Sequence, residues 1–303
     1  SPLLGAKADY KDSKKRFFLF FLFLGIIFNL LLLLVGKGQW LLCLALFVVA
    51  RIGWAGANIF YDSFLPDVTS RDRMDSISSK GYAYGYLGSV IPFLVIIGLI
   101  LSAGLEDTLP VEATKTGFFI VALWWLLFSL PGIKNLRQVH YIPSSGSSFT
   151  DSLKRLKQTL THIRSYKQVF LFLLAYFFYI DGVSTIITMS TAYGRDLGFG
   201  VTMLIIVLLF IQLVAFPFAL LFGRLAAIYS AKRMLFIGIF IYALATIIAF
   251  FLPSIENLHT KTMVFWCIAF LIASAMGGIQ ALSRSFYGKI IPAEKSAEFF
   301  GFY

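Results

Sequence analysis

Eight long apolar runs limit what this chain can fold into more than any other feature of the sequence. A helix needs about 20 mainly apolar residues to cross the hydrocarbon core of a bilayer, and each run has roughly that length. The runs are apolar on all sides, whereas helices of soluble proteins keep a polar face. They cover residues 17–35, 40–60, 82–103, 117–133, 169–191, 201–222, 234–252 and 263–282. We therefore expect an all-α integral membrane protein whose main partner is the lipid bilayer.

The basic charge of the chain follows the predicted membrane topology. The formal net charge is +11, which on a soluble chain would suggest nucleic-acid binding. When the runs are threaded back and forth, however, nearly all lysines and arginines in loops fall on one side. The loops on the other side hold Lys37, Lys115, Arg195 and Lys261. Loops rich in Lys and Arg stay in the cytoplasm, so we assign the basic side to the cytoplasm and expect no nucleic-acid partner.

A twelve-residue pattern near the start of the chain recurs 218 positions later, each time as a short basic hairpin between two spans. The first copy contains Gly5, Asp9, Lys14, Lys15 and Arg16, and the second contains Gly223, Lys232 and Arg233. Ala227 stands where the first copy has Asp9. A hairpin repeated at this distance indicates two related halves, an arrangement typical of transporters.

The longest connection, residues 134–168, falls between the fourth and fifth runs. It contains a stretch of Ser and Gly, and then Phe149, Leu153, Leu156, Leu160 and Ile163 follow at helical spacing among basic residues. Such a helix either lies on the anionic membrane surface or forms a solvated linker. We place the N-terminal half in residues 1–133, a cytoplasmic linker in 134–168 and the C-terminal half in 169–303.

If each half has six helices, the eight runs are spans 3–10 of an expected twelve. Residues 1–6 are then the end of span 2, and residues 297–303 are the start of span 11. The two repeated hairpins fall in the 2–3 and 8–9 loops, which are equivalent positions in the two halves. We therefore expect this chain to be an internal piece of a longer protein.

This arrangement resembles the major facilitator superfamily. The hairpin from Gly5 to Arg16 has a glycine, a small residue before an acid and then several bases, and it is similar to the loop 2–3 signature of that superfamily. The resemblance implies two six-helix halves that rock around a site at the membrane midplane. It also implies that Asp9 latches the halves on the cytoplasmic side by meeting the start of helix 11, which we expect beyond Tyr303.

Two further stretches are similar to the vacuole-effluxer-like branch, which contains autophagy-related vacuolar amino-acid effluxers. They are residues 64–66 with 77–88, and residues 277–286 with 291–292 and 296–301. The resemblance implies a secondary transporter of amino acids or similar small solutes. We expect it in a bacterial plasma membrane, or in a vacuolar membrane if the source is eukaryotic, as a monomer without a cofactor.

Two charged residues lie deep in predicted spans and are the first candidates for a transport site, because charge at membrane depth is costly. Arg51 is near the middle of the second run, and Asp181 is near the middle of the fifth. In the superfamily these spans, 4 and 7, line the central cavity. Helical spacing adds further polar residues to the same faces: Asn58 and Asp62 with Arg51, Ser184 and Thr185 with Asp181, and Gln280 with Arg284 on span 10.

Each of these residues has an interpretation in transport and an alternative, purely structural one. Arg51 would hold a carboxylate and Asp181 an amine or a proton, so that a zwitterionic amino acid uses both; the alternative is a structural ion pair between the halves. Asp62 and Arg284, nearer the cytoplasmic end, suit gating or anchoring better than substrate contact. Hydroxyls such as that of Ser184 alternatively bond to carbonyls of their own helix.

Enzymatic chemistry has no support in the sequence. The three histidines lie in loops, and the sequence contains no His-Glu-x-x-His, Cys/His cluster or Gly-x-Ser-x-Gly pattern. We therefore expect neither a metal site nor an enzyme. Two alternatives to an amino-acid transporter stay open: a receptor or scaffold that uses a transporter fold without solute flux, and a transporter of another kind of solute.

Overall fold

The computed structural model of the chain describes residues 2–104, 110–143, 153 and 166–303. Within these residues, eight helices are long and apolar enough to cross a membrane. They are α2 (Ser13–Leu31) continued by the 3-10 turn η1 (Leu32–Leu34), α3 (Trp40–Ser63), α5 (Met74–Ser102), α6 (Val111–Asn135), α8 (Lys167–Asp196), α9 (Val201–Tyr229), α10 (Ala231–Phe251) continued by η3 (Leu252–Ser254), and α11 (Leu258–Ile290). Each contains one of the eight predicted apolar runs or nearly all of it, so the all-α membrane fold is confirmed.

Several helices extend past the apolar runs that predicted them. α5 begins at Met74 although its apolar run begins at residue 82. α11 has 33 residues, which at 1.5 Å per residue makes it about 50 Å long, against about 30 Å for a hydrocarbon core. Apolarity marks the part of a helix that faces lipid, whereas the polar ends are held by protein contacts. Four short elements complete the described chain: α1 (Pro2–Ala8), α4 (Leu65–Val68), η4 (Ala293–Lys295) and α12 (Ser296–Phe302).

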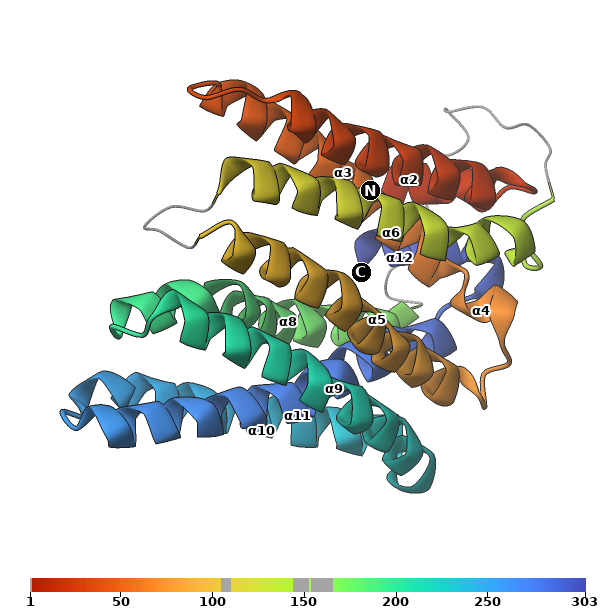
Figure 1. Cartoon of the computed structure of the whole chain (residues 1–303). Coiled ribbons are helices and arrows are strands. Elements are labelled where there is room, and N and C mark those ends of the chain that lie inside the picture. Colours follow the sequence, from red (N-terminus) through yellow and green to blue (C-terminus); the bar gives the residue numbers. More distant parts are fainter. Residues whose placement is uncertain (1, 105–109, 144–152, 154–165) are drawn as a thin grey trace. The chain divides into compact units, whose positions relative to one another are not determined.

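Part of the chain forms a first compact unit, which comprises Ser1–Ser70, Ile91–Lys167 and Ile291–Tyr303. In this unit α2 packs along α3, α6 packs against α2, and α12 packs against α1 and α3 (Figure 1). The helices α2 and α3 approach closely, since a Cβ atom on Gly53 would lie 2.3 Å from the backbone nitrogen of Gly25. The rings of Phe17 and Phe21 both stack on Phe60.

The second compact unit comprises Arg71–Val90 and Gln168–Ile290. Its centre is α11, which packs against α9 and α10 (Figure 1). In its most apolar stretch α11 is 61% buried, whereas no other candidate span exceeds 28%. Glycines allow this packing, because a Cβ atom on Gly278 would lie 2.2 Å from the ring of Phe222. The polar side chains of α11 are therefore surrounded by protein rather than lipid.

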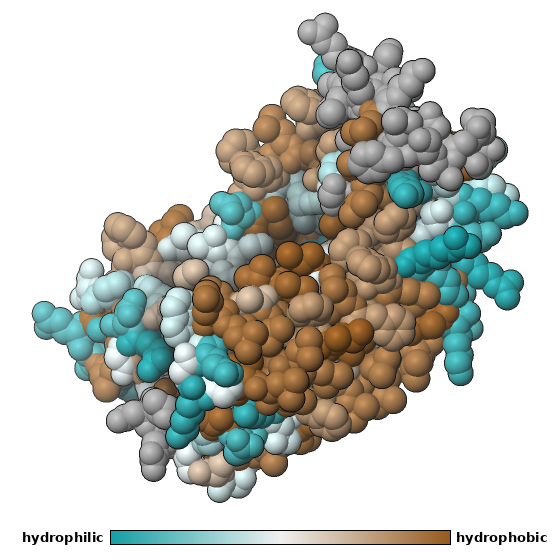
Figure 2. All heavy atoms as spheres, turned by 90° about the horizontal axis from the view of Figure 1, so that it is seen from above, coloured by the Kyte–Doolittle hydropathy of each residue, from teal (hydrophilic) through white to brown (hydrophobic). Residues whose placement is uncertain are grey.

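Large apolar side chains are exposed along the other helices. Phe20, Phe240 and Phe250 are 61%, 69% and 77% exposed. On the face seen in Figure 2, hydrophobic residues form a broad field, and hydrophilic residues gather at its two ends. An apolar helix surface of this kind is suited to contact with lipid, because lipid tails neither donate nor accept hydrogen bonds.

Each compact unit includes one short segment from the other predicted half. α12 lies in the first unit, and the start of α5 lies in the second. The predicted boundaries of the halves, at residues 133 and 168, describe the duplication of the sequence and stay a prediction. The amphipathic helix expected at residues 149–163 lies outside the described residues, apart from Leu153.

Candidate functional site

Asp9, in the first hairpin, is fully buried against the start of α12. Its two carboxylate oxygens accept hydrogen bonds from the backbone N–H groups of Ala297 (2.8 Å) and Glu298 (3.0 Å). These are first-turn donors that a helix cannot satisfy itself, and a carboxylate there is also favoured by the helix dipole. The backbones of α1 and α12 meet closely at Gly5, where an added Cβ atom would lie 2.1 Å from the carbonyl oxygen of Ala297. Only glycine fits at this position.

This contact corrects one expectation from the sequence. We expected the partner of Asp9 beyond Tyr303, but α12 begins at Ser296 and already supplies both donors. Residues 297–303 were themselves expected to start span 11, and α12 begins one residue earlier, so Asp9 meets the helix start that was expected there. The predicted role of Asp9 as a latch stays a prediction.

The environment of Asp9 shifts its titration. Burial raises the pKa of the Asp9 carboxyl from its ordinary value of 3.8 to about 7, against the opposing effects of the Lys14 charge and the two backbone N–H groups. The nearby Glu298 carboxylate adds a smaller upward contribution. Loss of hydration therefore outweighs the bonds that Asp9 gains.

Lys14 is fully buried at the same hairpin and has a direct counter-ion. Its ammonium group lies 2.7 Å from Asp67 Oδ2, and it also donates to Ser296 Oγ (2.7 Å) and to the carbonyl of Ser63 (3.2 Å). All three ammonium hydrogens thus have acceptors, as a buried cation requires. The sequence analysis missed Asp67; its place directly after the Phe-Leu-Pro stretch that ends span 4 was the available signal.

Asp67 also binds the start of the central linker. Its Oδ1 accepts hydrogen bonds from the backbone N–H of Val139 (3.1 Å) and of His140 (2.7 Å), and the His140 ring nitrogen lies 3.1 Å away. Gln138 bonds to the hairpin backbone, accepting from Lys14 N (3.3 Å) and donating to the carbonyl of Ala8 (3.2 Å). The linker is therefore fastened to the hairpin where it leaves α6. Of the remaining predicted hairpin residues, Lys15 is half-buried and Arg16 is exposed.

The second hairpin also packs through its glycine, although against a side chain rather than against backbone. A Cβ atom on Gly223 would lie 2.5 Å from the Cβ atom of Ser79 on α5. Ala227, at the position equivalent to Asp9, is exposed, and so are Lys232 and Arg233. The second copy thus retains a close approach at its glycine, here to a side chain of α5, but the residue that stands in place of Asp9 cannot bind a helix start.

The two predicted polar residues of α11 both bind α5. Arg284 is buried; its Nε donates to Ser78 Oγ (2.9 Å), its Nη2 donates to the Ser78 carbonyl (3.1 Å), and its guanidinium lies 4.7 Å from the ring centre of Tyr82. Gln280 Oε1 accepts a hydrogen bond from Tyr86 Oη (2.7 Å). Their place on a solute path stays a prediction, and their contacts within the unit are with another helix.

On α3, Arg51 is exposed, and its guanidinium stacks over the ring of Trp54 at 4.4 Å from the ring centre. This cation–π contact holds the guanidinium flat while its N–H edge can still meet a carboxylate. Sequence reasoning missed Trp54, although it follows Arg51 by one helical turn. Asn58 and Asp62 on the same helix are half-buried.

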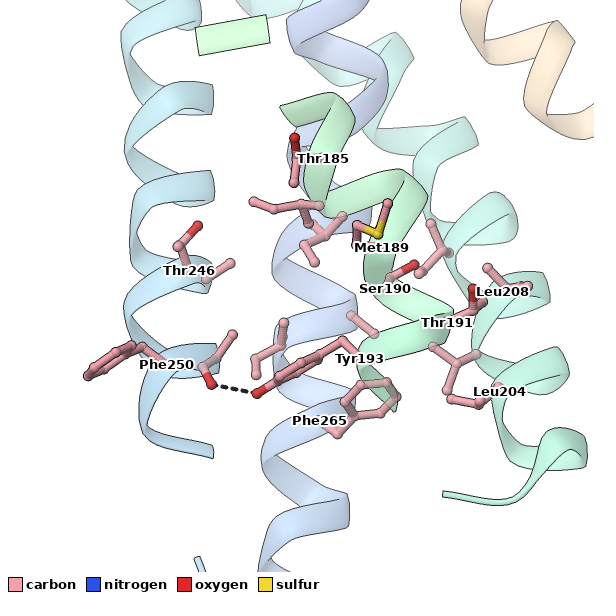
Figure 3. Close-up of a pocket in the computed structure, with 18 residues that line it drawn as sticks. Thr185, Met189, Ser190, Thr191, Tyr193, Leu204, Leu208, Thr246, Phe250 and Phe265 are labelled. Atoms are coloured by element: carbon pink, nitrogen blue, oxygen red, sulfur yellow. Dashed lines mark hydrogen bonds between the residues drawn. The ribbon is translucent and has the colours of Figure 1, made fainter. Parts of the chain in front are cut away.

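On α8, Asp181, Ser184 and Thr185 are all exposed within their unit. Thr185 lies at the edge of an open cavity of about 340 Å³ lined by α8, α9, α10 and α11. Figure 3 shows Thr185, Met189 and Tyr193 following α8 along this cavity. Arg51 and Asp181 belong to different compact units, so their predicted cooperation stays a prediction.

The wall of this cavity is largely apolar, and three of its hydroxyl groups are turned to backbone carbonyls. Tyr193 Oη donates to the carbonyl of Ala249 (2.6 Å), the dashed bond in Figure 3, and Thr246 Oγ1 donates to the carbonyl of Tyr242 (2.8 Å). Ser190 bonds within its own helix in the same manner. No sequence pattern predicts this cavity, since its lining is spread over four helices.

Comparison with known proteins places these features in a family context. The profile of the family described as "Vacuole effluxer Atg22 like" matches residues 1–303. The chain is 48% identical to an uncharacterized MFS-type transporter, YxiO, of Bacillus subtilis over 305 residues, which cover 100% of this chain and 69% of that protein. It is 25% identical to autophagy-related protein 22 of Coccidioides immitis over 387 residues, covering 99% of this chain and 61% of the relative.

Proposed function

Since the chain belongs to the Atg22-like vacuole effluxer family of MFS-type transporters, we propose that it works in a secondary transporter for small solutes, amino acids among them. The family match over the whole chain carries this proposal. The chain spans about two thirds of the length of the relatives above, 69% and 61%. The activity, solute and coupling of the whole protein are therefore part of the proposal.

The proposed solute site uses the two charged residues at membrane depth. Arg51 on α3 presents a stacked guanidinium, which suits a planar carboxylate. Asp181 on α8 lies one helical turn before Thr185, and Thr185 lies at the edge of the apolar cavity. A solute with a carboxylate, an ammonium group and a small uncharged side chain matches these features. Rocking of the two halves would expose this site to each side of the membrane in turn.

We propose that a proton drives the cycle through Asp181. A carboxyl group that moves between water and a low-dielectric site changes its proton affinity during the cycle, and this couples proton transfer to conformational change. The test is amino-acid uptake into proteoliposomes that contain the protein at the full length of its gene product. Asp181→Asn should abolish uptake driven by a pH gradient, while solute exchange at equal pH persists at a higher solute concentration, because the lost carboxylate also weakens the binding of the ammonium group. Full pH-driven uptake by this variant would refute the assignment.

A matched variant and a second site variant complete this experiment. Asp196→Asn removes an exposed carboxylate at the end of α8 and should leave uptake unchanged. Arg51→Gln should weaken the binding of solutes that carry a carboxylate, by roughly tenfold or more for a lost charge-assisted contact. Absence of flux for every solute, with or without an ion gradient, would favour the receptor or scaffold alternative instead.

A further inference from the structure

The start of α5 and the end of α11 are joined by a charged cluster that the proposed solute site does not use. Asp75 is 6% exposed, and its Oδ1 accepts a hydrogen bond from Ser285 Oγ (2.6 Å). Lys289 forms an ion pair with Asp75 Oδ2, its side chain being 27% exposed. The pair is thus largely shielded from water, where a charge–charge contact is stronger than at an open surface.

We call this contact between the start of α5 and the end of α11 the second joint, and the contact of Asp9 with the start of α12 the first joint. Hydrogen bonds extend the second joint one turn further along both helices. Ser78 Oγ donates to the carbonyl of Ala281 (2.7 Å) and accepts from Arg284 Nε (2.9 Å). The contacts from Asp75 to Ser78 and from Ala281 to Lys289 therefore lie on facing sides of α5 and α11. This density of polar contacts is high for helices whose other surfaces are apolar.

The joint sits beside the second repeated hairpin, and its position follows the repeat. Gly5 contacts Ala297, and Gly223 contacts Ser79. The offset of 218 residues separates Gly5 from Gly223 and also separates Ser79 from Ala297. The start of α5 therefore contacts the second hairpin at the position equivalent to the one where the start of α12 contacts the first hairpin.

The two joints differ in the origin of their acid. In the first, the hairpin supplies Asp9 to the start of α12. In the second, the hairpin has Ala227 instead, and the acid is Asp75 in the first turn of α5 itself. An acid in the first turn of a helix is favoured by the helix dipole, and from there Asp75 reaches the end of α11.

We propose that Asp75, Ser285 and Lys289 form a second cytoplasmic latch, which does beside the second hairpin what Ala227, without a carboxylate, cannot do. The latch holds α5, from the predicted N-terminal half, against α11, from the predicted C-terminal half. This inference rests on the proposed rocking of the halves, because only then must α5 and α11 separate on the cytoplasmic side. Both latches would then open in the same step.

The test measures whether each latch is open, without using a solute. The background lacks both cysteines (Cys43→Ser, Cys267→Ser). One reporter, Ser79→Cys, is buried beside the second hairpin, and a second reporter, Ala8→Cys, is buried in the first. A membrane-impermeant maleimide is applied to the cytoplasmic face in inside-out vesicles of the full-length gene product. The rate of labelling reports how often each joint opens.

Lys289→Gln should raise the labelling rate of both reporters about tenfold, the factor that corresponds to about 1.4 kcal/mol. Asp75→Asn should act similarly, and the double variant should be no faster than either single variant, because both remove the same ion pair. Ser285→Ala should have a smaller effect in the same direction. Lys80→Gln removes an exposed charge beside Ser79 on α5 and should not change the labelling rate of either reporter.

Three results would overturn the latch: unchanged labelling in Lys289→Gln, additive effects in the double variant, or faster labelling at Ser79→Cys alone. The last would mean that α5 frays locally without opening the first joint. These outcomes are independent of flux. If the unaltered protein moves no solute but Lys289→Gln opens both reporters, the latch stands and the proposed transport function fails.

Discussion

Two buried charges in one hairpin, Asp9 and Lys14, show how a partner decides the state of an ionisable group. Lys14 meets the carboxylate of Asp67 at 2.7 Å and has two further acceptors. Asp9 accepts hydrogen bonds from two backbone N–H groups, and within the described part of the chain it forms no ion pair. Burial therefore raises the pKa of Asp9 to about 7. At neutral pH the first joint is poised between two protonation states.

The pH dependence of this joint has a definite sign. Because the pKa of Asp9 is about 7 when docked and 3.8 ordinarily, the docked hairpin binds the proton more tightly than a released one. The contribution of Asp9 to the stability of the docked hairpin is therefore greatest below about pH 4. This contribution falls as the pH rises towards 7 and does not change further above that. We predict that an infrared titration will show one buried carboxyl group with a pKa near 7, which disappears in Asp9→Asn.

The controls for this titration use neighbouring residues. Asp12→Asn, which removes an exposed carboxylate from the same hairpin, should leave the titrating band in place. Lys14→Met should move the pKa of Asp9 higher, because the Lys14 charge lowers it. A band that titrates near pH 4 in the unaltered protein would contradict the burial argument.

At the same scale, the sequence identified one side of each contact better than the other. Asp9 and Lys14 were predicted because they belong to a repeated motif. The partners of Lys14, Asp67 and Ser296, were not predicted, because these contacts join residues 53 and 282 positions apart. Asp75 and Lys289 were likewise missed, since each is an ordinary charge at a helix end until the fold brings the two together.

Among the elements, α2 and α3 depend on glycine to pack as closely as they do. A Cβ atom on Gly53 would lie 2.3 Å from Gly25 N and 2.5 Å from Gly25 Cα. Backbone cannot move aside as a flexible side chain can, so Gly53→Ala must push the helices apart. Small residues have this role in membrane helix pairs generally, because lipid provides no hydrophobic force to hold helices together.

We predict that Gly53→Ala lowers the stability of the purified protein by about 1–3 kcal/mol, the usual cost of overpacking. Thermal melting in detergent, followed by tryptophan fluorescence, measures this change. Gly98→Ala is the matched variant: it lies inside α5, and a Cβ atom there meets no described heavy atom within 4 Å. Because alanine favours helix, that variant should melt at the same temperature or higher. Equal melting of Gly53→Ala and the unaltered protein would contradict the packing argument.

Helix positions were easier to predict than helix ends. Each apolar run of about 20 residues marks a segment that needs lipid around it, which is why all eight runs correspond to helices. The start of α5 escaped prediction because Asp75, Ser78 and Ser79 are polar and look like loop residues. In the structure they face α11 and the second hairpin, so protein contacts rather than lipid determine where α5 begins.

In the whole chain, the buried joints constrain how many times the polypeptide crosses the membrane. Asp9 contacts the start of α12, so both lie on one side of the bilayer, with eight candidate spans between them. Asp75 contacts Lys289 across six of those spans. An even number of crossings separates the partners in both cases. If one of the six runs from α5 to α11 were buried rather than spanning, one partner of each pair would lie on the wrong side; if α2 or α3 were buried, only the Asp9 pair would be split.

This parity predicts the accessibility of every loop once one side is known. The basic loops should be cytoplasmic, so in a background without Cys43 and Cys267, single cysteines at Arg16, Lys80 and Arg233 should react with an impermeant maleimide only after cells are permeabilised. Cysteines at Lys37 and His259 should react in intact cells. All five positions are exposed in the structure, so a missing reaction reflects sidedness and not burial. If any one of them reacts from the side opposite to that expected, a crossing has been miscounted. The reversal of all five together would keep the eight spans and refute only the orientation inferred from charge.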